Sequence, residues 1–182
     1  MMKLWDQKGV DMTEKTLDEA IKRGMQLGIQ HFVAASRTGY TARLLAQKKV
    51  NLVCVRYHTG FKEAGKQMMP EEVLQELEEQ GVKVLTTTHL MGGLDRGLEN
   101  KLGGAYPPSI VAHTLRMFGQ GTKVAVEIAV MALDAGLISY NSEVISIGGS
   151  GGGADTALVV QPAHAKNFFD TQIKEIICKP RV

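Results

Sequence analysis

Cysteine and aromatic residues are scarce in this chain, and the scarcity of cysteine limits what kind of protein it can be. Only two cysteines, Cys54 and Cys178, occur in 182 residues, which excludes the disulfide framework of a small secreted scaffold. Cys54 lies in the apolar run 52–55, and this favours a small core residue over a catalytic thiol. The sequence therefore predicts a reduced, cytoplasmic protein.

Long apolar runs and an excess of one charge are also missing. No segment approaches the roughly 20 apolar residues that a membrane helix needs, and residues 1–11 lack the apolar core of a signal peptide. The 21 Lys and Arg against 19 Asp and Glu give a net charge of +2, with no basic stripe or tail. We therefore expect neither a membrane nor a nucleic acid as partner.

Helix-like and strand-like segments alternate along the chain, whose length fits one domain, residues 1–182. Apolar periodicity predicts helices over 13–27, 42–49, 70–80, 109–118 and 123–135. Short apolar runs predict strands over 29–35, 51–57, 82–86, 143–147 and 156–160, with a last edge strand over 173–178. This alternation predicts a three-layer α/β fold with a mostly parallel sheet. The connection 148–155 is too short for a crossover helix, so strand 156–160 should run antiparallel to its predecessor.

Residues 90–105 differ from the rest of the chain, because they hold five glycines and their apolar residues do not repeat at the spacing of a helix or a strand. We expect a long mobile loop here, and a loop of this length is more typical of function than of simple connection.

The segment Ser36-Arg37-Thr38-Gly39-Tyr40-Thr41-Ala42 joins an apolar strand to a helix and is rich in hydroxyl groups. The first N–H groups of a helix lack intrahelical partners and lie at its positive end, so such a junction binds anions. Ser36, Thr38 and Thr41 add hydroxyl donors, and Arg37 adds charge. The segment predicts a site for a phosphorylated small molecule; the alternative is that Ser36 or Thr38 only caps the helix.

Three further loops should reach the same edge of the sheet, where ligands of open parallel sheets bind. Tyr57, His58 and Thr59 follow one strand, and His89 follows the next. A glycine loop (residues 148–155) follows another and includes Gly149, Ser150, Gly151 and Asp155. Its alternative is a flexible hairpin with Asp155 as a bracing residue. His58 and His89 lack a third ligand at convincing spacing, so we expect no metal site.

Glu127 is the one acid in the apolar stretch 124–133, so it needs a partner if that helix is buried. Arg37, Lys123 or a backbone N–H could serve, and both structural burial and ligand contact stay open for this carboxylate. The helix is more apolar than one packing face requires. That excess fits either a homo-oligomer interface or the core of a monomer.

Residues 36–42 resemble the Thr-Arg-Ser-Gly-x-Ser-Ala loop of the pyruvate kinase C-terminal domain, which in some members holds a phosphate of an allosteric sugar phosphate. The order of elements is also similar to that domain, a five-stranded sheet with its last strand antiparallel. Residues 57–61, 101–104, 126–132, 153–157 and 167–177 are similar to stand-alone microbial proteins described as pyruvate kinase alpha/beta domain-like. This resemblance extends over nearly the whole chain.

The resemblance implies a flavin mononucleotide (FMN) site. Ser36, Thr38, Gly39 and Thr41 would take the phosphate, while Tyr57, His58, Thr59, His89 and the glycine loop would flank the ribityl chain and ring. It implies no pyruvate kinase activity, because the chain is too short for that enzyme's catalytic barrel. Three functions stay open: an FMN protein such as a flavin-dependent oxidoreductase, a non-enzymatic sensor of a sugar phosphate or nucleotide, and a phosphoester hydrolase using His58 or His89.

Overall fold

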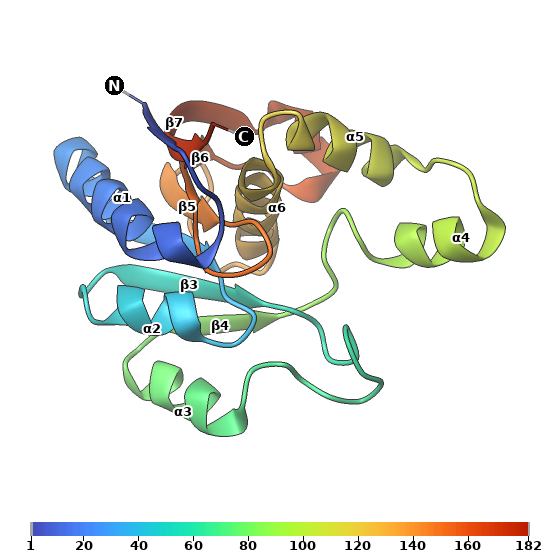
Figure 1. Ribbon diagram of the computed structural model, residues 1–182, viewed down its shortest axis with the longest axis horizontal. Coiled ribbons are helices and arrows are strands. Elements are labelled where there is room, and N and C mark those ends of the chain that lie inside the picture. The colour runs from blue at the N-terminus through green and yellow to red at the C-terminus, as the bar shows by residue number, and fades with distance from the viewer. Residues whose placement is uncertain (1, 182) are drawn as a thin grey trace.

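A seven-stranded sheet forms the middle layer of the structure, a computed structural model that describes residues 2–181 (Figure 1). The strands are β1 (Lys3–Trp5), β2 (His31–Ala35), β3 (Asn51–Arg56), β4 (Lys83–Thr86), β5 (Val144–Gly148), β6 (Thr156–Gln161) and β7 (Gln172–Pro180). They lie in the order β1-β7-β6-β5-β2-β3-β4. Only β6 runs against the others, since it is antiparallel to both β5 and β7.

Helices cover both faces of this sheet. One face carries α1 (Thr13–Leu27), α2 (Tyr40–Ala46) and α3 (Glu71–Glu79), and the other carries α5 (Pro107–Arg116) and α6 (Gln120–Asp134). Side chains of a strand alternate between faces: Phe32 and Ala34 pack on the first side, and Val33 packs on the second. The three-layer, mostly parallel α/β fold is therefore confirmed.

The sheet has two more strands than the five-stranded relative led us to expect. β7 is an interior strand and not an edge, because the short β1 pairs with it in parallel and places Lys3 opposite Cys178. Three residues are too few to show a period, so the sequence did not predict β1. The antiparallel direction of β6 is confirmed by the pairing of Ile147 with Ala157, although this strand is followed by β7 and is not the last.

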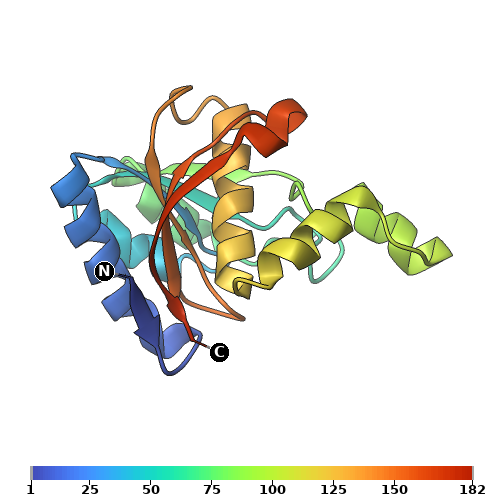
Figure 2. The ribbon, with the colours of Figure 1, turned by 90° about the horizontal axis from the view of Figure 1, so that it is seen from above.

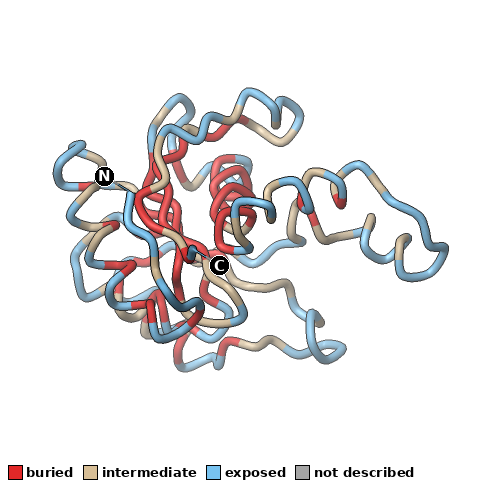
Figure 3. The backbone as a smooth tube through the Cα atoms, turned by 45° about the horizontal axis from the view of Figure 1, so that its top comes forward, coloured by how far each residue is buried: buried red, intermediate tan, exposed pale blue. Residues whose placement is uncertain are grey.

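The prediction of a loop over residues 90–105 is wrong for its central part. Residues Leu94–Leu102 form helix α4, between Gly93 and Gly103. Its three leucines at i, i+4 and i+8 form the stripe of an amphipathic helix, yet none of its residues is buried. Helices α4 and α5 extend from the body as an arm (residues 94–116) (Figure 2), and most of α4 is exposed (Figure 3).

Helix α6 lies in the core, as its composition predicts. Ten hydrophobic or small residues and the pair Lys123 and Glu127 are buried along it, and it packs on β5, β6, β2 and α5. Ser146 on β5 donates a hydrogen bond of 2.6 Å to the carbonyl of Ala125. The chain itself thus covers the apolar faces of α6, and a homo-oligomer stays a prediction that this helix does not require.

Both cysteines are free and completely buried, which confirms Cys54 as a core residue. Burial raises the pKa of each thiol to about 12. Between residues 2 and 181, no helix is both long and apolar enough to span a bilayer.

Candidate functional site

A cleft of about 740 Å³ opens where the loops after β2, β3, β4 and β5 meet the start of α6. This volume is within the range of small-molecule sites. Nine of the predicted residues line it: Ser36, Arg37, Thr38, Thr41, Tyr57, His89, Gly149, Ser150 and Gly151. The sheet edge at which the sequence places a ligand therefore carries a cavity of ligand size.

Four predicted residues do not line the cleft, namely Gly39, His58, Thr59 and Asp155. Gly39 has φ of 93° and lies so close to Val73 that a Cβ would be 2.2 Å from its Cγ1. This glycine lets the loop turn against α3 rather than facing a ligand. His58 packs edge-on against Phe61, with ring centroids 5.5 Å apart.

Asp155 is a completely buried brace for the glycine loop. Its Oδ2 accepts hydrogen bonds from the N–H groups of Gly9 (2.9 Å) and Ser150 (3.0 Å). Its Oδ1 accepts a bond of 2.8 Å from the Thr156 hydroxyl. With these acceptor sites used inside the protein, Asp155 shapes the wall of the cleft without contacting its interior.

Loop 36–41 presents unpaired backbone donors at the cleft. Within the described part of the chain, the N–H groups of residues 37–41 have no hydrogen-bond acceptor. Gly39 occupies the N-cap position of α2, and Ser36 Oγ accepts a 3.3 Å bond from the Ala42 N–H, so this serine satisfies one donor of the first turn beside the free donors. A run of free N–H groups makes a concavity that suits an oxyanion. The Arg37 side chain lines the same cleft.

Aromatic side chains form the part of the cleft after β3 and β4. The rings of Tyr57 and Phe61 stack with centroids 3.9 Å apart, and His89 lies 5.1 Å from Tyr57. The His89 Nε2 atom is buried without a hydrogen-bond partner among residues 2–181. Burial lowers the pKa of His89, while the nearby Glu127 carboxylate opposes this shift. At neutral pH this imidazole is neutral and can offer its unpaired nitrogen to a ligand.

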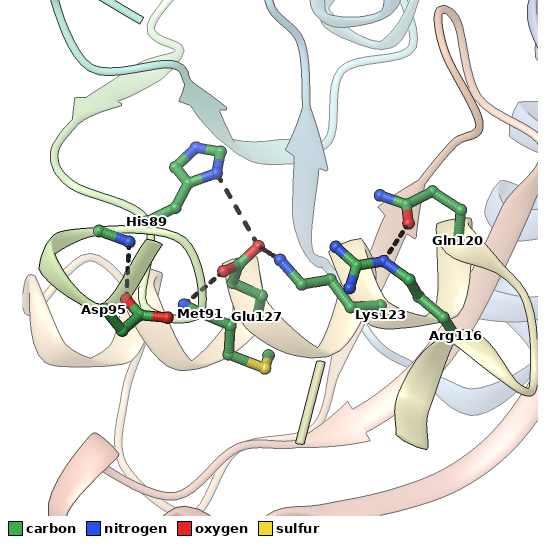
Figure 4. Close-up of polar contacts among 8 residues, drawn as sticks. His89, Met91, Asp95, Arg116, Gln120, Lys123 and Glu127 are labelled. Carbon is green, nitrogen blue, oxygen red and sulfur yellow. Dashed lines mark hydrogen bonds and ion pairs between the residues drawn. The ribbon is translucent and has the colours of Figure 1, made fainter. Parts of the chain in front are cut away.

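A buried ion pair lies at the base of the cleft (Figure 4). Lys123 Nζ donates to Glu127 Oε2 over 2.5 Å, and the Met91 N–H donates to Glu127 Oε1 over 2.6 Å. His89 Nδ1 lies 3.8 Å from Glu127 Oε2. Of the three partners that the sequence left open for Glu127, Lys123 and a backbone N–H are confirmed, whereas Arg37 makes no ion pair with it.

Sequence reasoning missed most of the positive charge in the cleft. Arg96 on α4, Arg116 at the end of α5, and Lys123 on α6 line it together. The sequence predicts Lys123 only as a partner for Glu127. Arg96 lies in a segment predicted as a loop, so no pattern could place it. The i, i+4 spacing of Lys123 and Glu127 in an apolar helix was the available signal for this corner of the site.

Metal ligands do not gather here. In residues 2–181, no group of three or more His, Cys, Asp or Glu side chains is arranged to hold a metal ion. The cleft instead combines free N–H donors, cations, stacked aromatic rings and a glycine-rich wall. These groups can bind an anionic, flat-ringed molecule by hydrogen bonding, charge and stacking.

Comparison with known proteins relates this chain to pyruvate kinases. The model of the family described as "Pyruvate kinase, alpha/beta domain" matches residues 14–160. Among solved structures, a pyruvate kinase from Cryptosporidium parvum is similar, with 14% sequence identity and a TM-score of 0.42. That alignment covers 84% of this chain and 24% of the other, so this chain spans about a quarter of the length of that pyruvate kinase.

Proposed function

This chain belongs to the pyruvate kinase alpha/beta domain family, and on that premise we propose that its cleft binds a phosphorylated small molecule, specifically FMN. The observation that carries the proposal is loop 36–41, where free N–H groups and Arg37 meet in one cavity. The proposal does not include the pyruvate kinase reaction, because the matching model describes one domain of that enzyme.

The phosphate is the first part of the argument. A phosphate monoester carries close to two negative charges at neutral pH, and free N–H groups with an arginine satisfy both its charge and its oxygens. Thr38 and Thr41 also line the cleft and can add hydroxyl donors. In this proposal Ser36 keeps its bond to the Ala42 N–H and positions the loop.

The ring is the second part, and the residues present fit a flavin. A flat heterocycle needs an aromatic or backbone surface to lie against, which the Tyr57 and Phe61 stack and residues 149–153 of the glycine loop supply. It also needs a donor or acceptor at its polar edge, which the unpaired His89 Nε2 supplies. A bound flavin would supply one- and two-electron redox chemistry; the chain would bind it, orient it and limit its contact with water.

FMN binding is tested by the visible absorption spectrum of the purified protein and by mass spectrometry of what heat releases. Affinity is then measured by fluorescence titration with FMN and with riboflavin, which has the same ring and no phosphate. We expect Thr38→Glu to weaken FMN binding at least about tenfold, ~1.4 kcal/mol, through like-charge repulsion. Thr59→Glu is the matched control, because Thr59 lies outside the cleft.

Two results would overturn the FMN proposal. One is equal affinity for riboflavin and FMN, since the phosphate loop would then contribute nothing. The other is unchanged FMN affinity in Thr38→Glu, which would remove loop 36–41 as the phosphate site.

A non-enzymatic sensor of a sugar phosphate or nucleotide is the second candidate function. Three arginines line the cleft, Arg37, Arg96 and Arg116, and together they carry more positive charge than a single phosphate monoester needs for neutralisation. This excess favours ligands with more negative charge than FMN. The sensor predicts that colourless phosphorylated metabolites displace FMN. It also predicts that nicotinamide nucleotides do not reduce a flavin bound to the protein.

A further inference from the structure

We propose that α4 is a dimer interface, at which a leucine ridge formed by Leu94, Leu98 and Leu102 packs against the same ridge of a second copy of the chain. The proposal goes beyond the proposed function, because it does not depend on what the cleft binds. It also places self-association on a different helix from the one whose composition suggests it, since α6 is buried within its own chain and no residue of α4 is buried.

Exposed apolar side chains are concentrated on the arm and the two residues that follow it. Of the sixteen large hydrophobic residues that are exposed among residues 2–181, six lie within residues 94–118. On α4, Leu94 and Leu102 are 78% and 71% exposed, and Leu98 between them is 36% exposed. Residues four apart adjoin one another on a helix, so these three leucines form one continuous strip. Such a gathered apolar surface marks an interaction site, whereas single exposed hydrophobic residues are ordinary.

Helix α4 receives little packing from its own chain. It has nine residues, and Gly97 in its interior lowers its intrinsic stability. Helices this short are marginal in water unless an apolar face packs against another surface. The arm supplies a hydrogen bond of 3.1 Å from Ser109 Oγ to Glu99 Oε2, but the leucine ridge stays open to solvent, as the exposure of α4 in Figure 3 shows. An occupant from outside the chain would therefore stabilise this helix.

The geometry of the leucine ridge suits a copy of itself. Side chains at i, i+4 and i+8 form one of the ridges by which helices interlock, and two such ridges pack at about −50° in the commonest class of helix contact. A two-fold axis close to Leu98 brings the ridges of two copies together in this way, and most homodimers have such a symmetric contact. The arm extends from the body (Figure 2), so two arms can cross at α4 while the two bodies stay apart.

The charges beside the leucine ridge also favour a second copy as the occupant. Successive residues of a helix are about 100° apart, so Asp95 and Glu99 flank one side of the ridge and Lys101 flanks the other. A two-fold axis that runs roughly along both helices sets the acidic flank of one copy against Lys101 of the other. With two acids and two bases, α4 has no net charge, so its surface does not attract a strongly acidic or basic partner.

The first test measures self-association by analytical ultracentrifugation over a range of protein concentrations. We expect a species of about twice the 19.8 kDa of one chain. The double substitution Leu94→Glu and Leu102→Glu should raise the Kd of the dimer at least about tenfold, because charges would replace apolar contacts. Both leucines are exposed in the single chain, so this variant should fold. Met25→Glu with Phe169→Glu is the matched control, since these side chains are 76% and 86% exposed outside the arm.

The second test locates the contact with an introduced cysteine. Cys54 and Cys178 are the only cysteines of the chain and are completely buried, so a new surface thiol reacts without interference from them. Leu98→Cys should give a covalent dimer on mild oxidation, because the two Cα atoms near the axis would lie within the roughly 7 Å that a disulfide allows. Met25→Cys on α1 is the control and should give far less covalent dimer.

Three results would overturn the proposed dimer. The first is a monomer at about 100 µM protein, where a contact with a micromolar Kd would be formed; the leucine ridge would then serve a different protein or none. The second is a dimer whose Kd is unchanged by the two glutamates on α4, which would place the interface on another face. The third is equal disulfide formation in Leu98→Cys and Met25→Cys. Circular dichroism of each variant checks that it is folded.

Discussion

Lys123 and Glu127 lie one turn apart on α6 and form an ion pair with 7% and 1% of their side chains exposed. This pair lies beneath a ligand-sized cleft and not on the solvent side of a helix. Removing one partner of a buried pair leaves an uncompensated charge, whereas removing both leaves none. The pair therefore couples the stability of the core to the charge of the cleft.

Single neutralisation of this pair should be costly. We expect Lys123→Met and Glu127→Gln each to lower the free energy of unfolding by about 3–5 kcal/mol, and the double variant to recover at least half of the summed loss. Urea denaturation followed by circular dichroism gives these values. Glu76→Gln is the control, since the Arg43–Glu76 pair is roughly two-fifths exposed and should change stability by about 1 kcal/mol or less.

His89 should make the protein less stable in acid. Its pKa is lowered below the ordinary 6.5, mainly by burial. Between that lowered pKa and 6.5 the unfolded chain binds more protons than the folded one, so stability rises with pH through this window and is lost as the pH falls. His89→Gln should therefore narrow the difference in unfolding free energy between pH 7.5 and about pH 5.

The control for this pH effect is His113→Gln, because His113 is exposed on α5. If both variants show the same pH dependence of stability as the unsubstituted protein, then protonation of the His89 imidazole does not contribute to the pH dependence of folding.

Gly39 should be hard to replace. A side chain there would have to adopt φ of 93° and would place its Cβ 2.2 Å from Val73 Cγ1. We expect Gly39→Ala to cost about 2–4 kcal/mol from strain and overlap, measured by thermal or urea unfolding. Gly28→Ala is the matched control: its φ is 70° and no atom lies within 4 Å of the new Cβ. It should cost about 1–2 kcal/mol, and equal losses at both positions would contradict the packing argument.

Asp155 should stabilise the glycine loop without taking part in binding. Asp155→Ala leaves the N–H groups of Gly9 and Ser150 and the Thr156 hydroxyl without their acceptor. We therefore expect the free energy of unfolding to fall by about 2–4 kcal/mol. Hydrogen exchange should speed up at Gly9 and Ser150. Asp134→Ala is the control because its carboxylate is exposed, and unchanged exchange at Gly9 in Asp155→Ala would contradict the bracing role.

The sequence predicted the sheet and its covering helices because apolar runs and periodicity determine these elements directly. Strand 51–57 and helix 13–27 needed no tertiary information, and the structure places them within a residue of the prediction. In the arm, the predicted helix 109–118 corresponds to α5, whereas α4 could not be predicted, because the glycines around it suggested a loop and its leucines are exposed. The intrinsic helix propensity of its residues does not by itself determine whether such a segment forms a helix.

The cleft was predictable only where the chain order itself brings residues to one edge. Loop 36–41 and His89 follow strands that end there, so topology places them. Arg96 and Arg116 reach the cleft through the path of the arm, which no local pattern encodes. Asp155 braces the glycine loop, which was the alternative to the ligand contact predicted for it.

The pairing of β1 with β7 has a mechanical consequence. These strands are parallel neighbours, and the Arg181 N–H also donates to the Trp5 carbonyl. Because the two strands are parallel, the start of β1 and the end of β7 lie at opposite ends of the ladder that they share. A pull on the two chain ends therefore acts along the strands and loads their hydrogen bonds together in shear, rather than opening them one after another. The ladder between the first and last strands is thus the point at which the fold resists force.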